Sequence, residues 1–300
     1  MKKAYESLSY ALEEEPIYEE HLWIAEILRR QNKHDSAYAI LSQYIQTNKK
    51  SSFAFTVLSD MFNPQFSNWN KSDFDSSYSY IKKAVECNDN DGNAWMSVWN
   101  HAQRVGNDSL ERLSLEKLYT IGFFNENILE RNRWMLKSVP ESSIVITNGD
   151  FDTYPALSLQ IVESLRTDVV ILNHPMLTME WYAEMAHERA GIPFTLEYEP
   201  TPKGSIEFYE DGKPVALGCD SLIFHWLETN DQHTNRPLVF AGTVSSMLYE
   251  HLPYTRVNKG AYWYFNYSDN LFRNQNNLEQ ILFENVSPQK LLGPHCSSSD

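Results

Sequence analysis

Five polar side chains follow three apolar runs of the chain, and their types suit the binding of a hydroxyl-rich ligand or a divalent cation. Asp150 and Asp152 come after the first run, Asn173 and His174 end and follow the second, and Thr243 follows the third. Oxygen ligands of this kind bind hard cations, and they can equally hold a sugar or ribose hydroxyl. Open α/β sheets bind ligands at the carboxyl ends of their strands. We therefore predict one cleft that contains all five residues.

A simpler interpretation of the two aspartates competes with ligand binding. Asp150 and Asp152 precede a predicted helix, and an acidic side chain is stabilised there by the unpaired N–H groups and by the helix dipole. We favour this role in capping and loop ordering. His174 precedes a proline, which favours a structural role over that of a general base. The loop contains one glycine, so it is neither a dinucleotide nor a phosphate-binding loop, and we predict no metal and no cofactor.

The periodicity of the chain predicts the elements that would position these residues. Residues 144–146 and 169–172 are short apolar runs typical of strands buried on both faces. Apolar positions at helical spacing lie between them, and the length of this crossover suits a right-handed parallel βαβ unit. A further buried strand is predicted at 238–241. Residues 139–292 are therefore predicted to form a Rossmann-like α/β domain with a parallel sheet, and residues 293–300 a disordered tail.

Further turns, helices and strands are predicted for the second half of the chain. Asp211 and Gly212 stand between two apolar runs, which indicates a hairpin turn. Residues 221–228 predict a helix capped by Asp220 or Ser221. Residues 261–265 predict an edge strand, and further helices are expected at 245–250 and about 275–284.

Residues 1–138 predict a different architecture, made of tetratricopeptide-like helical hairpins. In the first hairpin, Ala25 and Ala37 occupy the two positions where small residues let the helices approach each other. A second copy begins near Ser52 and is interrupted by the polar, aromatic loop 63–71. A third begins at Gly92, with Trp99 in place of a small residue. The fold class expected for the whole chain is thus α + α/β.

Stacked hairpins of this kind leave a concave face, which commonly binds a peptide or a partner domain. We therefore expect a protein or peptide partner on that face. The alternative is that the hairpins only pack against the second half and stabilise it. Four tryptophans of the first half, Trp23, Trp95, Trp99 and Trp134, are predicted to be core residues rather than a ligand cage.

Composition narrows the function classes further. The 300 residues carry a formal net charge of −15, which argues against a nucleic-acid binder. The three cysteines lie far apart without a Cys-x-x-Cys pair, so they predict neither a disulfide framework nor a zinc site. The sequence contains no apolar run that approaches the ~20 residues of a membrane span. We expect a cytoplasmic protein, or a periplasmic one if an export signal has been removed.

One stretch of the second half resembles a known family. The resemblance is to the soluble region of bacterial protein O-mannosyltransferase-like membrane proteins, a domain of unknown function, over about residues 140–245. The residues that carry it are Asn148-Gly149-Asp150, Asp152-Thr153, Pro155, Leu159-Gln160, Val162-Glu163, Arg166, Asp168-Val169, Asn173, Leu177, Trp181-Tyr182, Arg236-Pro237, Phe240-Ala241 and Thr243-Val244. Phe151, Ser164 and Thr167 depart from the pattern, which tends to have Asn, Gly and Pro there.

The resemblance implies an accessory or recognition module. Family members of the glycosyltransferase type act through a membrane-embedded half with a lipid-linked sugar donor, and this sequence lacks such a half, so transferase activity is not carried over. We predict a protein-interaction or scaffold protein, accessory to envelope glycan or glycosylation machinery. The alternative is a carbohydrate-processing enzyme, or a subunit of one, with an acidic cleft at Asp150 and Asp152.

Overall fold

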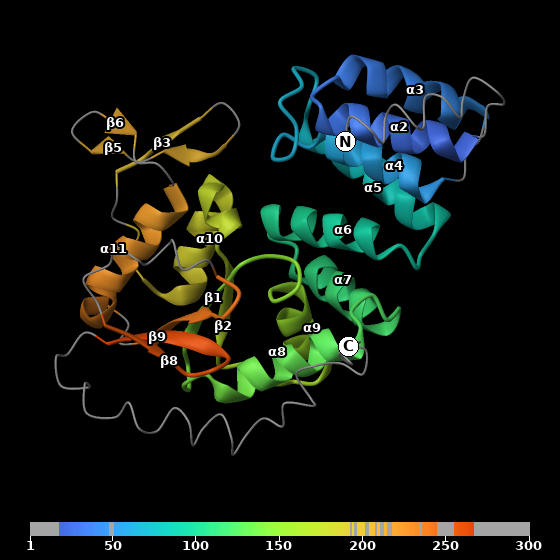
Figure 1. The fold of residues 1–300 in the computed structure, drawn as a ribbon. Coiled ribbons are helices and arrows are strands. Elements are labelled where there is room, and N and C mark those ends of the chain that lie inside the picture. The colour runs from blue at the N-terminus through green and yellow to red at the C-terminus, as the bar shows by residue number, and fades with distance from the viewer. Residues whose placement is uncertain are drawn as a thin grey trace, which may run out of the picture. The chain divides into compact units, whose positions relative to one another are not determined.

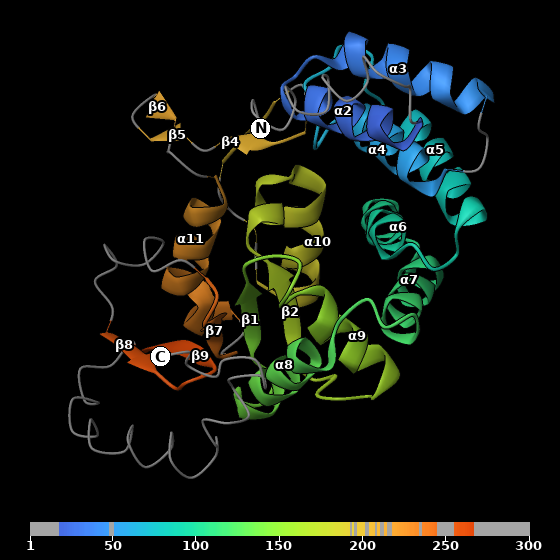
Figure 2. The same cartoon turned by 45° about the vertical axis from the view of Figure 1, so that its right-hand side comes forward.

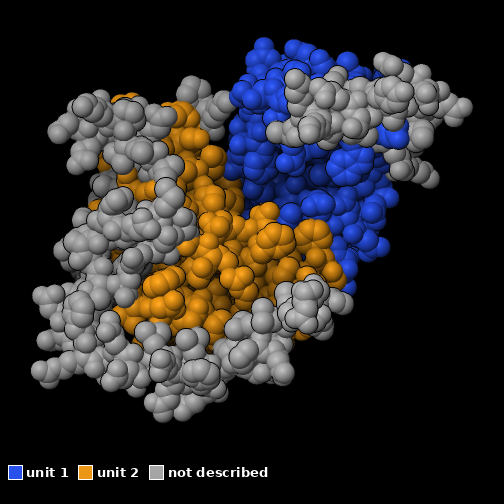
Figure 3. Space-filling model, viewed as in Figure 1, with its two compact units in different colours: residues 1–121 blue, residues 122–300 orange. Residues whose placement is uncertain are grey.

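The structure is a computed structural model. The residues that it describes are 18–47, 51–192, 194, 197–201, 204–207, 209–210, 213–214, 218–233, 236–244 and 255–266. The chain divides into two compact units, Met1–Ile121 and Gly122–Asp300 (Figure 3). The helices predicted at 245–250 and about 275–284, the turn at Asp211 and Gly212, and the tail at 293–300 lie outside the described residues.

The first unit is helical over its described residues. Consecutive helices pack in pairs, α2 on α3, α4 on α5 and α6 on α7 (Figure 1). Their bounds are α2 (Tyr18–Arg30), α3 (His34–Thr47), α4 (Ser52–Phe62), α5 (Phe74–Cys87), α6 (Gly92–Arg104) and α7 (Asp108–Thr120). This pairing agrees with the predicted helical character, while the tetratricopeptide-like arrangement itself stays a prediction.

The residues predicted to lie between paired helices are buried. Ala25 and Ala37 have no exposed surface. In the second pair, the hydroxyl oxygens of Ser59 and Ser77 are 3.1 Å apart in a buried contact, and the Ser77 hydroxyl also donates to the Ser59 carbonyl. These contacts satisfy the polar groups of the serines, so that the serines can stand where the first pair has alanines.

The loop 63–71 packs on the helices instead of extending into solvent. The Trp69 side chain is buried, and its ring centroid lies 5.4 Å from that of Tyr38 and 5.2 Å from that of Phe62. The Trp69 indole N–H also donates to the Asp35 carboxylate at 3.3 Å. The loop therefore adds an aromatic contact between α3 and α4.

His101 in α6 provides a prediction about acid sensitivity. Its ring stacks on Tyr78 with the centroids 3.5 Å apart, and burial together with the charge of Arg104 lowers the pKa of His101 to about 4. Because the unfolded chain binds the proton more readily, the neutral ring stabilises the fold fully above pH about 6.5, and this contribution is lost as the pH falls towards 4. Partial exposure limits the effect to about 1–2 kcal/mol.

The measurement is an NMR titration of the His101 ring together with urea unfolding at several pH values. The ring should titrate near pH 4, and the wild type should lose stability relative to His101→Gln between pH 6.5 and 4. A titration midpoint near 6.5 would contradict the prediction.

The second unit is built on a five-stranded sheet of order β2-β1-β7-β9-β8. The strand β1 pairs in parallel with β2, Ile144 facing Val170, and with β7, Ile144 facing Leu238. The predicted parallel βαβ unit is thus confirmed. The sheet strands are β1 (Ile144–Thr147), β2 (Val170–Asn173), β7 (Leu238–Ala241), β8 (Thr255–Asn258) and β9 (Tyr262–Asn266).

The sheet as a whole is mixed. β9 pairs antiparallel with β7 on one side and with β8 on the other. The strand predicted at 261–265 is confirmed as β9, but its predicted position at the edge of the sheet was wrong, because β8, which was not predicted, pairs with its outer side. The observed topology is that of a mixed sheet, and the Rossmann-like fold stays a prediction.

Helices lie on both sides of the sheet, α8 with α9 on one side and α10 with α11 on the other (Figures 1 and 2). Two small antiparallel pairs, β3 with β4 and β5 with β6, precede α11. The bounds are α8 (Glu126–Ser138), α9 (Tyr154–Val162), the 3-10 helix η1 (Pro175–Thr178), α10 (Glu180–Ala190), β3 (Glu199–Pro200), β4 (Ile206–Glu207), β5 (Tyr209–Glu210), β6 (Lys213–Pro214) and α11 (Gly218–His233).

The helix α8 belongs to the second compact unit, although the predicted domain boundary at 138/139 assigned it to the first half. α8 packs on α9, and Arg133 of α8 donates to the Glu163 carboxylate at 3.0 Å. Arg166 donates to the carbonyls of Leu136 and Val139 and pairs with Asp168 at 2.8 Å. Arg166 thus forms an ion pair with Asp168, and the same guanidinium connects the end of α8 to the α9–β2 turn.

Candidate functional site

A pocket of about 110 Å³, lined by both polar and apolar groups, lies where β7 ends, beside the loop that follows β1. Its walls come from α8, from the β1–α9 loop, from the end of β7 and from the turn before β9. The residues that line it are Arg131, Asn132, Trp134, Met135, Asp152, Ala241, Gly242, Thr243, Gly260 and Ala261. Two of the five predicted site residues, Asp152 and Thr243, therefore share one pocket.

Asp152 connects two walls of this pocket through hydrogen bonds. Its side chain is buried, and its carboxylate accepts hydrogen bonds from the backbone N–H groups of Asn148 and Gly149, both at 2.9 Å. The Thr243 hydroxyl donates to the same carboxylate, across 91 positions of sequence. Asp152 thus joins the end of β7 to the loop after β1, and charge-assisted bonds of this kind are stronger than neutral ones.

The predicted capping of the following helix by the aspartates was only partly right. Asp152 orders the loop, but the N-cap residue of α9 is Thr153, which makes no side-chain capping bond. Pro155 stands in the first turn and has no N–H group, so this helix start needs fewer acceptors. The Asp152 carboxylate is therefore directed to the loop behind it and to β7.

Asn132 fixes α8 against the same loop. Its side-chain amide donates to the carbonyl of Ile128 at 2.8 Å and to that of Phe151 at 3.0 Å. These two acceptors set the orientation of the amide, and its Oδ1 atom is buried without a hydrogen-bond partner. A buried acceptor of this kind requires an explanation, since most such groups in proteins are paired.

Asp150 and Phe151 form the outer part of the loop. Asp150 is exposed to solvent, but partial desolvation by the surrounding loop and, second, the charge of Asp152 raise the pKa of its carboxyl group above the usual range. Phe151 is 69% exposed and departs from the pattern of the resembling family. An exposed aromatic ring can pack on the apolar face of a sugar, and neighbouring carboxylates can accept hydrogen bonds from its hydroxyl groups.

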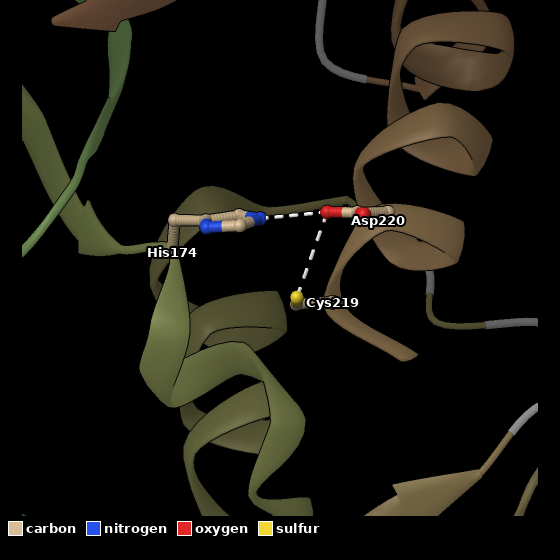
Figure 4. Close-up of side chains that lie close together, drawn as sticks. All are labelled: His174, Cys219 and Asp220. Atoms are coloured by element: carbon tan, nitrogen blue, oxygen red, sulfur yellow. Dashed lines mark hydrogen bonds and ion pairs between the residues drawn. The ribbon is translucent and has the colours of Figure 1, made fainter. Parts of the chain in front are cut away.

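Asn173 and His174 lie at the end of β2 and take part in other contacts. The backbone N–H of Asn173 donates to the Tyr182 hydroxyl at 2.8 Å, and this bond connects α10 to the end of β2. The His174 ring contacts the Asp220 carboxylate, with 2.7 Å between Nε2 and Oδ1 (Figure 4). The Cys219 thiol donates to the same oxygen at 3.6 Å.

Sequence reasoning missed Cys219 as a neighbour of His174 and misplaced Asp220. We expected Asp220 or Ser221 as an N-cap, but α11 begins at Gly218, so Asp220 lies within the first turn. Its carboxylate contacts His174 instead. Burial, followed by the charge of Asp220, raises the pKa of the Cys219 thiol to about 12, which disfavours a nucleophilic thiolate.

Part of the chain is similar to part of a protein named as an O-mannosyltransferase. Residues 130–208 match the family described as TMEM260-associated domain 2. A relative from Mus musculus, "Protein O-mannosyl-transferase TMEM260", is 29% identical over 106 residues, which are 33% of this chain and 13% of the mouse protein. No solved structure matches the chain. These findings support the predicted O-mannosyltransferase-like domain, with a relative from mouse where the resemblance had suggested bacteria.

The family match covers only part of the candidate site. It includes Asp150, Asp152, Asn173 and His174, and it ends before Cys219 and Thr243. The side chains that α11 and β7 contribute therefore lie outside the matched region. Among the described residues, no helix is long and apolar enough to cross a membrane.

Proposed function

We propose that this chain is an accessory module of protein O-mannosylation, and that its second unit recognises a carbohydrate at the pocket beside Asp152. The similarity to a protein named as an O-mannosyltransferase supports the link to glycosylation. The proposal of a carbohydrate ligand is based on the pocket, in which the Thr243 hydroxyl donates a hydrogen bond to the buried Asp152 carboxylate. The compartment predicted from the sequence stays a prediction.

The polar groups around the pocket are arranged before any ligand binds. Three donors of the chain hold Asp152, which leaves roughly one acceptor direction of its carboxylate for a ligand. The Thr243 hydroxyl oxygen can accept while it donates to Asp152. A pocket of about 110 Å³ holds several water molecules, so it suits the edge of one sugar ring rather than an oligosaccharide.

Ligand-observed NMR with methyl α-mannoside tests this function, with methyl α-galactoside and methyl α-glucoside for comparison. Saturable mannoside binding is expected, and Thr243→Val should weaken it about tenfold, because a lost hydrogen bond contributes roughly 1.4 kcal/mol. Thr178→Val is the matched control, since the Thr178 hydroxyl donates to the Pro175 carbonyl outside the pocket. If no sugar binds, or if both variants bind alike, the proposed function is wrong.

The enzymatic alternative would rely on Asp150, whose raised pKa is a property of general acids. The Asp152 carboxylate already accepts three hydrogen bonds from the chain, so we assign it to positioning rather than to proton transfer. We expect no turnover of p-nitrophenyl α-mannoside. Hydrolysis that disappears in Asp150→Asn would favour the enzyme.

We further propose that the paired helices of the first unit form tetratricopeptide-like repeats and bind a protein or peptide. Trp23 is 55% exposed, contrary to its prediction as a core residue, and its ring lies 4.7 Å from that of Phe53. Exposed tryptophans are enriched in the central contacts of protein interfaces. A photo-crosslinking residue at position 23 should yield one discrete adduct in native cells. The same residue at position 113, where Leu113 is 42% exposed, should yield none.

A further inference from the structure

Three different side chains that can bind metal, those of His174, Cys219 and Asp220, lie close together in the second unit. His174 follows β2 directly, whereas Cys219 and Asp220 lie in the first turn of α11. One ligand atom of each residue lies within 4.8 Å of the other two. Figure 4 shows the three side chains converging. We propose that His174, Cys219 and Asp220 bind a divalent transition metal, with Zn²⁺ as the expected ion.

Two of the three ligand-atom distances are within about 1 Å of those in a zinc site, and the third, between His174 and Cys219, lies within 4.8 Å and must shorten to about 3.5 Å. In a tetrahedral zinc site the ligand atoms stand about 3.3–3.8 Å apart, given the usual Zn–N, Zn–O and Zn–S bond lengths. The Cys219 sulfur and the Asp220 oxygen are already 3.6 Å apart. The His174 nitrogen and the Asp220 oxygen are 2.7 Å apart, so their hydrogen bond must open by less than about 1 Å.

The donor set discriminates among metals. Imidazole nitrogen and thiolate sulfur favour zinc and its neighbours in the first transition row, whereas calcium and magnesium prefer oxygen ligands alone. Binding forms a Zn–S bond and releases the thiol proton of Cys219 to the buffer. Three protein ligands leave the fourth position to water.

Backbone hydrogen bonds fix the position of His174, and two of the proposed metal-binding side chains are partly open to solvent. The His174 backbone N–H donates to the Thr147 carbonyl at 2.8 Å, and its carbonyl accepts from Leu177 at 3.1 Å. The side chains of His174 and Asp220 are 16% and 15% exposed, so an ion can enter from solvent. A bound metal would connect the end of β2 to α11.

The cysteine spacing had predicted the opposite. That prediction of no zinc site considered sites in which neighbouring cysteines supply the ligands. It does not apply to a mixed site, whose histidine lies 46 positions from the aspartate and is brought to it only by the fold.

Cobalt titration of the full chain, without an affinity tag and after chelator treatment, tests the site. One Co²⁺ per chain should bind, with a thiolate-to-cobalt absorption band, and Zn²⁺ should displace it and raise the melting temperature. Cys219→Ser should abolish the band. Since loss of an outer-shell group already costs about 10–100-fold in affinity, His174→Ala and Asp220→Asn should each weaken binding by more than about a hundredfold.

Matched variants make either result decisive. Cys87→Ser and His187→Ala replace the same residue types outside the cluster and should bind cobalt as the wild type does. If Cys219→Ser fails to fold, His174→Gln tests the site with every thiol intact. The proposal is overturned if the wild type shows no band, or if the band persists in Cys219→Ser or His174→Gln. Sugar binding at the Asp152 pocket is measured separately, so either proposal can fail alone.

Discussion

Asp152→Ala should lower the free energy of unfolding of the second unit by about 3 kcal/mol, because it leaves the donors of its buried carboxylate without their acceptor. The wild-type carboxylate accepts from Asn148, Gly149 and Thr243. An unpaired donor costs more than a hydrogen bond gains, and hydrogen bonds to charged groups lie at the upper end of the range. Urea unfolding, followed by hydrogen exchange in β1 and β7, measures the loss.

Asp150→Ala is the matched control for this prediction. It removes a carboxylate two positions earlier from a residue that is exposed, so its effect should stay within about 0.5 kcal/mol. Asp152→Ala should also release the end of β7 from the loop and abolish mannoside binding. Equal stability of the two variants would show that the Asp152 contacts do not support the fold.

Trp99→Ala should cost the first unit about 3–5 kcal/mol. The Trp99 side chain has no exposed surface, and it is among the largest fully buried side chains of the described chain. Its removal would leave a cavity that the neighbouring helices could fill only partly. The unfolding midpoint of the first unit, followed by helical circular dichroism and hydrogen exchange, should fall accordingly.

Trp23→Ala provides the comparison within the same unit. Trp23 is 55% exposed, so the substitution loses little buried area and should cost less than about 1 kcal/mol. A small effect for Trp99→Ala, similar to that of Trp23→Ala, would mean that the tryptophan does not occupy a well-packed core.

The packing around Trp99 could be predicted only in part from the sequence. Helical periodicity predicted that Trp99 would face the core, and it does. The sequence did not indicate how the same helix pair, α6 and α7, accommodates Glu111, which stands where the repeat usually has alanine. In the structure, the Gln103 side chain donates to the Glu111 carboxylate at 2.9 Å in a buried contact. Such pairing depends on the rotamers of both helices, which the spacing of residues does not encode.

The strands and helices around the site were determined by the sequence itself. The apolar runs of β1, β2 and β7 are local signals, and short apolar runs in a βαβ context favour buried parallel strands. The sequence therefore sufficed to bring the first loop and the end of β2 to one edge of the sheet. It also sufficed for the resemblance to O-mannosyltransferase-like proteins.

Only the tertiary structure decided which side chains meet at that edge. Asp152 reaches Thr243 across 91 positions, and His174 reaches Asp220 across 46. Contacts this distant depend on where α11 begins and on the order of the strands, and no local pattern carries that information. The predicted single cleft therefore became a pocket at Asp152 and Thr243 and a separate cluster at His174, Cys219 and Asp220.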